Sequence, residues 1–413
     1  MPDEGRSMKI AILGAGGAGV CAALELAHRG CDVDLYDENT EPLTQASRNN
    51  EGKIHLGLVY AKDRSLQTAK TMMQGAIHFT ACLERWIDLA SIDPLVSTPF
   101  YYAVHKDTMT DAADLERHYQ HCQRLFDDAC SATGLAYLGR ERRLIVEEVS
   151  VEEMAGLVSP HQVLRLYRTS ELAVDVRAIA DRLSAAVRAT SRIRFRSGAS
   201  ISSVTQPGDG KLCVAFRVGG AEHREIYDHV ANTLWHGRLE IDSTYGLTPE
   251  RGWIYRYKLG GWINVPMDAA AIPSVTFVLG PFGDIVNLGR RGLYFSWYPA
   301  GMIGTSQELK PPDWGRQISD SKRRAILRDS YAAARSLCPA LCSVEYSDDR
   351  IEAAGGVIFA WGETDIDHRR SRLHTRHEIG IRSEGNYHTV NTGKYTMVPY
   401  LGYKVAERIL GIS

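Results

Sequence analysis

A glycine-rich turn near the start of the chain constrains the fold more than any other feature of the sequence. Residues 9–13, "KIAIL", form an apolar run with β-branched residues, which is typical of a buried parallel strand. Gly14, Gly16 and Gly19 follow with the spacing G-x-G-x-x-G, and residues 19–29, "GVCAALELAHR", indicate a buried helix. The first glycine permits a tight turn, the second lets the backbone approach a pyrophosphate, and the third lets the helix lie close to the sheet.

A second strand and an acidic residue complete a β-α-β unit. Gly30 is placed to end the helix as a left-handed cap, and residues 31–37, "CDVDLYD", indicate a strand that ends in Asp37. An acidic side chain at this point accepts hydrogen bonds from adenosine ribose hydroxyls, which argues against a 2′-phosphorylated cofactor. The first helical turn, with Gly17 and Ala18, would present backbone N–H groups to the phosphates. The unit predicts a dinucleotide site better than an export signal or a chance clustering of glycines.

Composition excludes several other classes of protein. The formal net charge of −2 gives no basis for binding nucleic acid or an acidic membrane surface. No stretch approaches the roughly 20 apolar residues of a membrane helix. Eight cysteines without a C-x-x-C pair or zinc spacing indicate reduced thiols in a cytoplasmic protein and predict no metal site. A chain of 413 residues is long enough for two domains.

Residues 46–63, "ASRNNEGKIHLGLVYAKD", resemble the second flavin-contacting segment of the D-amino-acid oxidase-like (DAO-type) family. This family includes glycine oxidases and D-amino-acid dehydrogenases. Its Ser-x-x-Asn-x-Gly element runs past the pyrophosphate and ribityl chain of FAD. The resemblance assigns this element to Ser47, Arg48, Asn50 and Gly52, and places Lys53, Ile54 and His55 near the isoalloxazine ring. The histidine that holds flavin covalently in some relatives falls at Ile54, so we expect non-covalent FAD.

Residues 386–410, "NYHTVNTGKYTMVPYLGYKVAERIL", resemble the closing segment of the same family, in which a turn precedes a final helix that points at the flavin pyrimidine edge. The resemblance places at that turn Thr392, Gly393, Lys394 and Tyr395. Pro399 falls in the first turn of the final helix or just ahead of it. In the middle of the chain the match is partial, because Trp235 stands where the family has a small glycine near the cofactor.

These matches imply an α/β fold with a Rossmann-like FAD-binding domain and a second, mostly antiparallel α+β substrate domain. The FAD-binding domain is expected to be discontinuous, with residues 1–90, 160–244 and 345–413. The substrate domain is expected to combine residues 91–159 and 245–344. Within the latter, helical spacing predicts a helix in residues 110–134, and alternating runs predict strands from 252 to 300.

Four residues are candidates for catalysis. Lys394 would stabilise negative charge on the flavin, and His55 would act in acid–base chemistry; a surface lysine and a packed core histidine are the alternatives. Alternation in "FSWYPAG" sends Tyr298 towards a pocket. Amino-acid-oxidising relatives usually clamp the substrate carboxylate with a Gly-x-Arg-Pro arginine, which is missing here, and Arg350 is the nearest candidate.

The region that replaces Gly-x-Arg-Pro is highly charged. Its Glu363, Asp365, His368 and Arg372 predict either a polar cluster or, more simply, a charged loop. The missing element also means that the substrate need not be a simple α-amino acid.

The resemblance implies an FAD-dependent oxidoreductase that oxidises the C–N bond of an amine or amino acid-like small molecule by hydride transfer to flavin N5. Oxygen or another electron acceptor would then reoxidise the flavin. The alternatives are a flavin-binding subunit without its own turnover and an FAD-dependent monooxygenase, whose Gly-Asp element would not be expected where Gly283 and Asp284 lie. An NAD-only dehydrogenase leaves the second and closing segments unexplained. The sequence leaves the substrate, the acceptor and the oligomeric state open.

Overall fold

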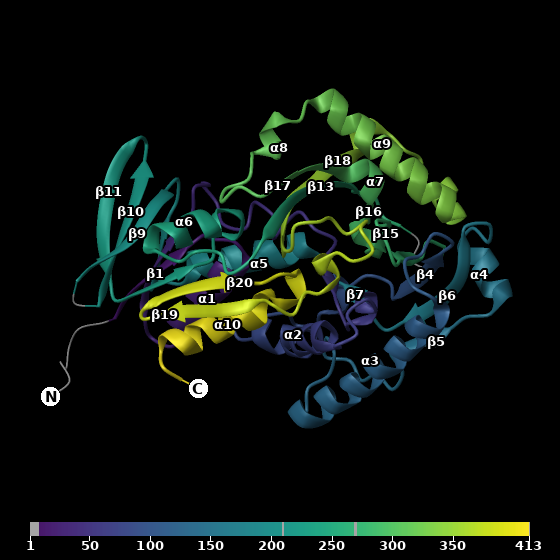
Figure 1. Cartoon of the computed structure of the whole chain (residues 1–413), viewed down its shortest axis with the longest axis horizontal. Helices are drawn as coiled ribbons and strands as arrows, with labels where there is room; N and C mark the ends of the chain where they lie inside the picture. The colour runs from purple at the N-terminus through teal and green to yellow at the C-terminus, as the bar shows by residue number, and fades with distance from the viewer. Residues whose placement is uncertain (1–7, 209, 268–270, 413) are drawn as a thin grey trace.

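The computed structural model describes residues 8–208, 210–267 and 271–412. Two large sheets lie side by side, each covered by helices, with a small three-stranded sheet at one end of the molecule (Figure 1). Residues 1–7 and 413 of the predicted FAD-binding domain lie outside the described residues. The mixed architecture of parallel and antiparallel sheets confirms the predicted fold class.

The first sheet has six strands in the order β19-β20-β12-β1-β2-β8. Its strands are β1 (Lys9–Leu13), β2 (Asp32–Tyr36), β8 (Ile193–Arg196), β12 (His229–Asn232), β19 (Gly380–Glu384) and β20 (Tyr387–Asn391). All neighbours are parallel except β19 and β20. Helices α1 (Gly17–His28), α5 (Val176–Ala189) and α10 (Val398–Ile409) pack together on one face, and α2 (Gln67–Leu83) packs against α10.

Both faces of β1 are buried, which explains its continuous apolar sequence. Ile10 and Ile12 belong to the core that includes α1. Ala11 and Leu13 point to the opposite face, in a core shared with the three-stranded sheet and α6 (Arg238–Tyr245). That small sheet consists of β9 (Ser200–Gly208), β10 (Lys211–Val218) and β11 (Ala221–Tyr227).

The second sheet has nine strands and is antiparallel except where β4 pairs with β14. In sheet order its strands are β17 (Met302–Ser306), β13 (Trp253–Ile263), β16 (Leu293–Trp297), β15 (Gly283–Asn287), β14 (Ser274–Val278), β4 (Phe100–His105), β6 (Val163–Thr169) and β5 (Val146–Glu148). β18 (Ile351–Trp361) pairs with β13 over its whole length. Helix α9 (Asp320–Leu337) contacts β13, β15 and β16.

The remaining elements connect these layers. They are the strand pair β3 (Lys53–Ile54) and β7 (Leu172–Ala173), and the helices α3 (Ala112–Thr133), α4 (Val151–Leu157), α7 (Tyr298–Gly301) and α8 (Trp314–Gln317). Helix α3 confirms the helix predicted in residues 110–134, and β13 to β16 confirm the predicted strands. Within the described residues, no helix combines the length and apolarity needed to cross a bilayer.

Two strands join a different sheet from the one that the predicted division assigned. β6 and β18 fall inside the ranges 160–244 and 345–413, which were predicted for the FAD-binding domain, yet both pair within the nine-stranded sheet. The physical reason is long-range pairing: β6 pairs with β4, at least 58 residues away in sequence, and β18 pairs with β13, at least 88 residues away. Neither partner is visible in the local pattern of the strand itself.

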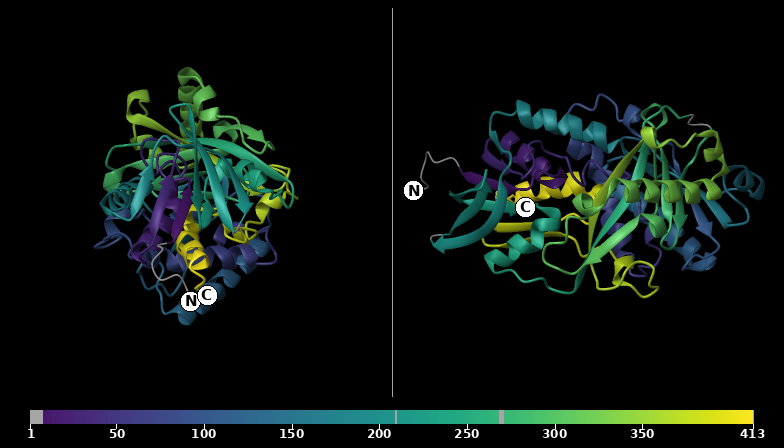
Figure 2. Two further views of the ribbon diagram at one scale, coloured as in Figure 1. Left: turned by 90° about the vertical axis from the view of Figure 1, so that its left-hand side faces the viewer. Right: turned by 90° about the horizontal axis from the view of Figure 1, so that it is seen from above.

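The first and last helices of the chain pack closely together, as both views of Figure 2 show. The approach depends on Gly402 of α10, because a Cβ there would lie 2.4 Å from the Cβ of Cys21 and 3.0 Å from the carbonyl oxygen of Ala18. The two helices therefore bring the two ends of the sequence to the same place in the fold.

We predict that Gly402→Ala destabilises the protein by about 1–3 kcal/mol, because overpacking must push α10 away from α1. Chemical denaturation of the variant would measure the change. Gly156→Ala in α4 is the matched control, since a Cβ there meets no atom within 4 Å. Equal stability of both variants would contradict the close packing.

Candidate active site

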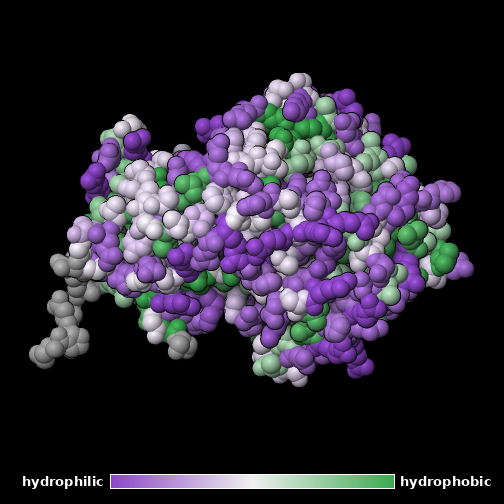
Figure 3. Space-filling model, in the orientation of Figure 1, coloured by the Kyte–Doolittle hydropathy of each residue, from purple (hydrophilic) through white to green (hydrophobic). Residues whose placement is uncertain are grey.

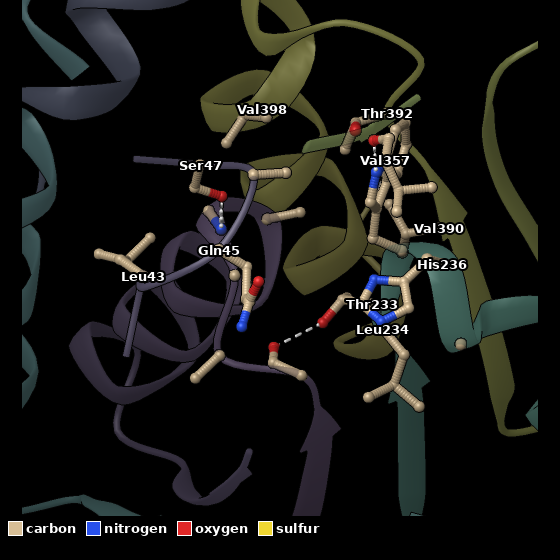
Figure 4. A pocket seen from close by; sticks show the side chains of 18 of the residues that line it. Leu43, Gln45, Ser47, Thr233, Leu234, His236, Val357, Val390, Thr392 and Val398 are labelled. Atoms are coloured by element: carbon tan, nitrogen blue, oxygen red, sulfur yellow. Dashed lines mark hydrogen bonds between the residues drawn. The ribbon is translucent and has the colours of Figure 1, made fainter. Parts of the chain in front are cut away.

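A cleft opens at the carboxyl ends of β1 and β12 and enters the space between the two large sheets. Its cavity volume is about 260 Å³, and its mouth is open to solvent. Side chains of Leu43, Gln45 and Ser47 face His236 and Val357 across it (Figure 4). The predicted cofactor residues that line it are Gly14, Gly16, Gly17, Ala18, Asp37, Ser47, Asn50, Lys53, Thr392, Gly393, Lys394 and Tyr395.

The glycine turn shapes one end of the cleft. Gly14 has φ +96°, a left-handed conformation that glycine adopts without strain. Gly19 does not line the cleft, but a Cβ there would lie 1.9 Å from the carbonyl oxygen of Gly14, so it permits the close approach of helix and strand. A Cβ on Gly16 would meet only the hydroxyl of Ser47, at 3.7 Å, and therefore points to open space. Helix α1 has no side-chain cap and no acidic residue in its first turn, so its N-terminus suits a phosphate.

Asp37 and Ser47 bind the backbone around this turn. The Asp37 carboxylate accepts from the backbone N–H of Ala15 at 2.8 Å and from that of Asn39 at 2.9 Å. The Ser47 hydroxyl accepts from the backbone N–H of Gly17 at 2.8 Å (Figure 4). Both side chains also line the cleft, so they fix the turn and border the space for a ligand.

The remaining members of the Ser-x-x-Asn-x-Gly element differ in their placement. The Asn50 amide donates to the carbonyl of Ala46 at 2.8 Å, and its oxygen accepts from the N–H of Gly52 at 2.8 Å. Gly52 has φ +70°, and a Cβ there would lie 2.1 Å from the carbonyl of Val174. Arg48 turns away from the cleft to an exposed ion pair with Asp181. The element therefore contributes Ser47 and Asn50 to the lining and keeps Gly52 for backbone packing.

Lys53 and Ile54 of β3 lie at the junction of the two sheets. The Lys53 ammonium contacts Thr276 and lies 3.1 Å from a carboxylate oxygen of Asp284. Burial alone would raise the pKa of Asp284, but Lys53 and Lys258 hold it below the ordinary value. Ile54 is fully buried, does not line the cleft, and accepts a hydrogen bond at its backbone oxygen from Tyr137.

His55 lines the cleft although its side chain is almost fully buried. Its backbone N–H donates to the hydroxyl of Thr396 at 3.0 Å, and its Nδ1 lies 3.8 Å from a carboxyl oxygen of Glu171. Burial, with Lys394 and Lys53 acting in the same direction, lowers the pKa of His55 well below the ordinary value. The imidazole is therefore neutral at physiological pH.

The turn before the last helix borders the cleft from the C-terminal part of the chain. Gly393 has φ +63°, and its N–H donates to the Asn391 side chain at 3.2 Å. Lys394 follows, and burial, with Arg376 and Lys258 acting in the same direction, lowers its pKa to about 8. Pro399 lies in the first turn of α10, as predicted.

Trp235 also lines the cleft, where the family resemblance expected a glycine. Its φ of +56° is the left-handed conformation that glycine adopts freely and tryptophan rarely. The indole N–H donates to the carbonyl of Val357 at 2.7 Å, which links the 3₁₀ helix Trp235–Gly237, just after β12, to the second sheet.

Tyr298 and Arg350 lie outside the lining of the cleft. Tyr298 is the first residue of α7 rather than part of a strand; its hydroxyl contacts Arg256 and donates to Asp365 at 3.2 Å. Arg350 is exposed, and its closest carboxylate partner is Glu345 at 3.9 Å. The nine-stranded sheet thus holds Tyr298 within a partly buried polar cluster and leaves Arg350 on the surface.

Two buried arginines were missed by the sequence analysis. Arg256 is 2% exposed and binds Asp365 at 3.0 Å. Arg376 is 7% exposed and donates to the carbonyl of Phe359 at 3.2 Å. Burial, with Arg256 acting in the same direction, lowers the pKa of Arg376 to about 10. Arg256 left a usable signal, because it and Lys258 fall on one face of an otherwise largely apolar strand; Arg376 stands among other charged residues and left none.

The β-α-β unit, the uncapped helix and the long cleft define a dinucleotide-binding oxidoreductase fold. The family model for the FAD-dependent oxidoreductases called DAO matches residues 9–408, and the chain belongs to this family. It is an FAD-dependent enzyme. The open space at Gly16 and the uncapped start of α1 fit the FAD pyrophosphate.

Individual relatives are distant. A D-amino acid dehydrogenase from Rhizobium rhizogenes is 29% identical over 178 residues, which cover 38% of this chain and 40% of that protein. The FAD-dependent monooxygenase FPY4 from Fusarium mangiferae is 21% identical over 326 residues, 78% of this chain and 73% of that protein. Glycine oxidase from Geobacillus kaustophilus has a similar fold, with a TM-score of 0.68, 16% identity and coverage of 98% of this chain and 96% of that chain.

We predict that Gly16→Val yields a folded protein that does not retain FAD. The added side chain enters the open space of the cleft without meeting protein backbone. It therefore blocks cofactor binding without disturbing the fold. The ratio of flavin to protein absorbance and the circular dichroism spectrum would measure both effects. Gly16→Ala is the smaller-volume control, and a fully yellow Gly16→Val protein would contradict the placement of the pyrophosphate.

Proposed function

We propose that this enzyme oxidises the C–N bond of a small amine that carries a carboxylate. The proposal rests on two cations: Arg376, which is buried, and Lys394, which is half-buried, lines the cleft and has its pKa lowered in part by the charge of Arg376. In the described part of the chain, neither has a carboxylate within salt-bridge distance. Burying a cation without a partner is costly, so a substrate anion would relieve this cost. Arg376 would then replace the arginine of the absent Gly-x-Arg-Pro element.

The cofactor contacts belong to the same proposal. The glycine turn with Gly16 would receive the pyrophosphate, Asp37 the adenosine ribose, and Ser47 and Asn50 the ribityl chain. Lys394 and its turn would border the flavin ring. The support is that all these residues line one cleft.

When bound, FAD accepts a hydride at N5 and is reoxidised by oxygen or another acceptor. The chain's own residues orient the substrate and balance charge. Arg376 would fix the carboxylate through charge-assisted hydrogen bonds. Lys394, protonated below about pH 8, would stabilise negative charge next to the ring. Neutral His55 would accept a hydrogen bond or proton from the amine.

The Arg256–Tyr298–Asp365 cluster has a positioning role in this proposal. Asp365 neutralises Arg256, so this arginine is not free to hold the substrate. The cluster instead holds residue 365 of the 362–379 segment against the nine-stranded sheet, and the same segment carries Arg376. It therefore sets the position of the proposed carboxylate partner.

A monooxygenase is a second candidate, because the match to FPY4 covers most of both proteins. The two reactions differ in their products. Oxidation of a C–N bond reduces the flavin without oxygen and gives an imine, which water hydrolyses to a carbonyl compound and an amine or ammonia. A monooxygenase instead inserts an oxygen atom from O₂. Mass spectrometry of the product formed under ¹⁸O₂ would separate them.

We predict that carboxylate-bearing amines bleach the flavin under anaerobic conditions and that matched amines without a carboxylate do not. Sarcosine against dimethylamine and alanine against ethylamine are suitable pairs. Arg376→Gln should raise KM for the active substrate roughly 10- to 100-fold, as expected for loss of a charged hydrogen bond. Arg372→Gln is the matched control, since Arg372 lies exposed on the same segment. A flavin that no amine reduces would favour a binding subunit.

We also predict that flavin reduction slows as the pH rises above about 8. The lowered pKa of Lys394 means that its positive charge is present below this pH and is lost above it. Stopped-flow absorbance across pH 6–10 would measure the rate. Lys394→Met should be slow at every pH while keeping FAD bound, and Lys394→Arg should keep its rate above pH 8. An unchanged pH profile in Lys394→Met would remove this residue from the reaction.

A further inference from the structure

A second pocket, of about 550 Å³, lies outside the cleft, and we name it the outer pocket. Lys62 and Arg64 line it from the chain just after the 3₁₀ helix Leu58–Tyr60. Arg369 lines it from the 362–379 segment, and Asp111 and Asp114 line it from the start of α3. It therefore forms where three separate parts of the chain meet.

The acidic residues of the outer pocket are already engaged. Asp111 caps α3 by accepting from the backbone N–H of Asp114 at 2.7 Å. Asp114 contacts Arg117 and lies 3.6 Å from Arg64. In the described part of the chain, by contrast, no carboxylate lies within salt-bridge distance of Lys62 or Arg369. Lys62 and Arg369 thus line the pocket without a salt bridge in the described part of the chain, although Asp111 and Asp114 line it too.

Along the 362–379 segment, His374 lies between Arg369 of the outer pocket and Arg376 of the proposed carboxylate site. Burial, with Arg369 and Arg64 acting in the same direction, lowers the pKa of Lys62. His374 has its own pKa lowered by burial and by the charges of both Lys62 and Arg376. The 362–379 segment carries Arg369 at the outer pocket and Arg376 inside. In Figure 3 the middle of the visible face, over the yellow-green loops of Figure 1, is strongly hydrophilic.

The 362–379 segment, which carries both Arg369 and Arg376, is fixed to α2 and to the residues just before it. The backbone N–H of Arg376 donates to the hydroxyl of Thr68 at 2.8 Å, and His377 lies 3.4 Å from Asp63. Asp63 follows Lys62 directly in the chain, so the same contact fixes the spacing between the outer pocket and Arg376. A ligand with two charged ends would meet a preformed arrangement.

We propose that the outer pocket is a subsite for a second anionic group of the substrate, a carboxylate or a phosphate, held by Lys62 and Arg369. The position of the first carboxylate, near Arg376 and Lys394, rests on the proposed function. The substrate class is then a dianionic amine rather than a simple amino acid. This also gives a reason for the absence of Gly-x-Arg-Pro, because both recognition sites are provided by the 362–379 segment and residues near Lys62.

The test measures binding to the FAD-bound protein without turnover. Butyrate has one carboxylate; succinate, glutarate, adipate and pimelate have two at increasing separation, and 4-phosphonobutyrate replaces the second carboxylate with a phosphonate. Each would be titrated at low salt while the flavin absorbance is followed. We expect at least one dianion to bind roughly tenfold more tightly than butyrate. The preference should shrink in high salt.

Variants assign the preference to the outer pocket. In Lys62→Gln/Arg369→Gln, the tightest dianion should weaken to about the affinity of butyrate, and the affinity for butyrate should not change. Arg224→Gln is the control for loss of charge elsewhere. Arg224 is exposed on β11, and its substitution removes one positive charge. The proposal is overturned if no dianion binds more tightly than butyrate, or if the double variant keeps the wild-type preference.

The two proposals can fail separately. If no amine reduces the flavin but the dianion preference is present and disappears in the double variant, the subsite stands and C–N oxidation fails. If carboxylate-bearing amines reduce the flavin but the series shows no preference for a second charge, the proposed function stands and the subsite fails. Where the subsite stands, comparing 4-phosphonobutyrate with the dicarboxylate of the same length shows whether the outer pocket prefers a phosphonate or a carboxylate.

Discussion

The contact between the turn after β1 and the start of α1 is the constraint on which the rest of the structure depends. Gly19 lies against the carbonyl of Gly14 so closely that any side chain would have to displace the helix. The hydroxyl of Thr233 donates to the carbonyls of Leu13 at 2.8 Å and Gly14 at 2.9 Å, which ties the end of β12 to the same turn. Three distant parts of the sequence therefore meet here, because a Cβ on Gly17 would also lie 2.6 Å from Val398 of α10.

Charge balance organises the other end of the cleft. Lys53 and Lys258 share Asp284, and Arg256 has Asp365. Within the described residues, Arg376 and Lys394 have no such partner; burial is the main cause that lowers their pKa values and that of His55, and the neighbouring cations act in the same direction. This distribution of charge is the support for the proposed anionic substrate.

Much of the fold could be predicted because its signals are local. The spacing of glycines gave β1, the turn and α1, and helical periodicity gave α3. The segments around Ser47 and Lys394 carried the family resemblance, and the structure brings both to one cleft. The membership of β6 and β18 was not predictable in this way, because their strand partners lie at least 58 and 88 residues away in sequence.

The sequence by itself determined the dinucleotide unit, since a left-handed turn and a close helix approach require glycine wherever they occur. It also determined that the carboxylate-binding element of many relatives is absent. Only the tertiary structure decided which arginine takes a place near the cofactor cleft: Arg350 is exposed, whereas Arg376 is buried near Lys394. Both lie in similarly charged sequence, and what separates them is burial and the distribution of counter-charges, which depend on packing between distant segments.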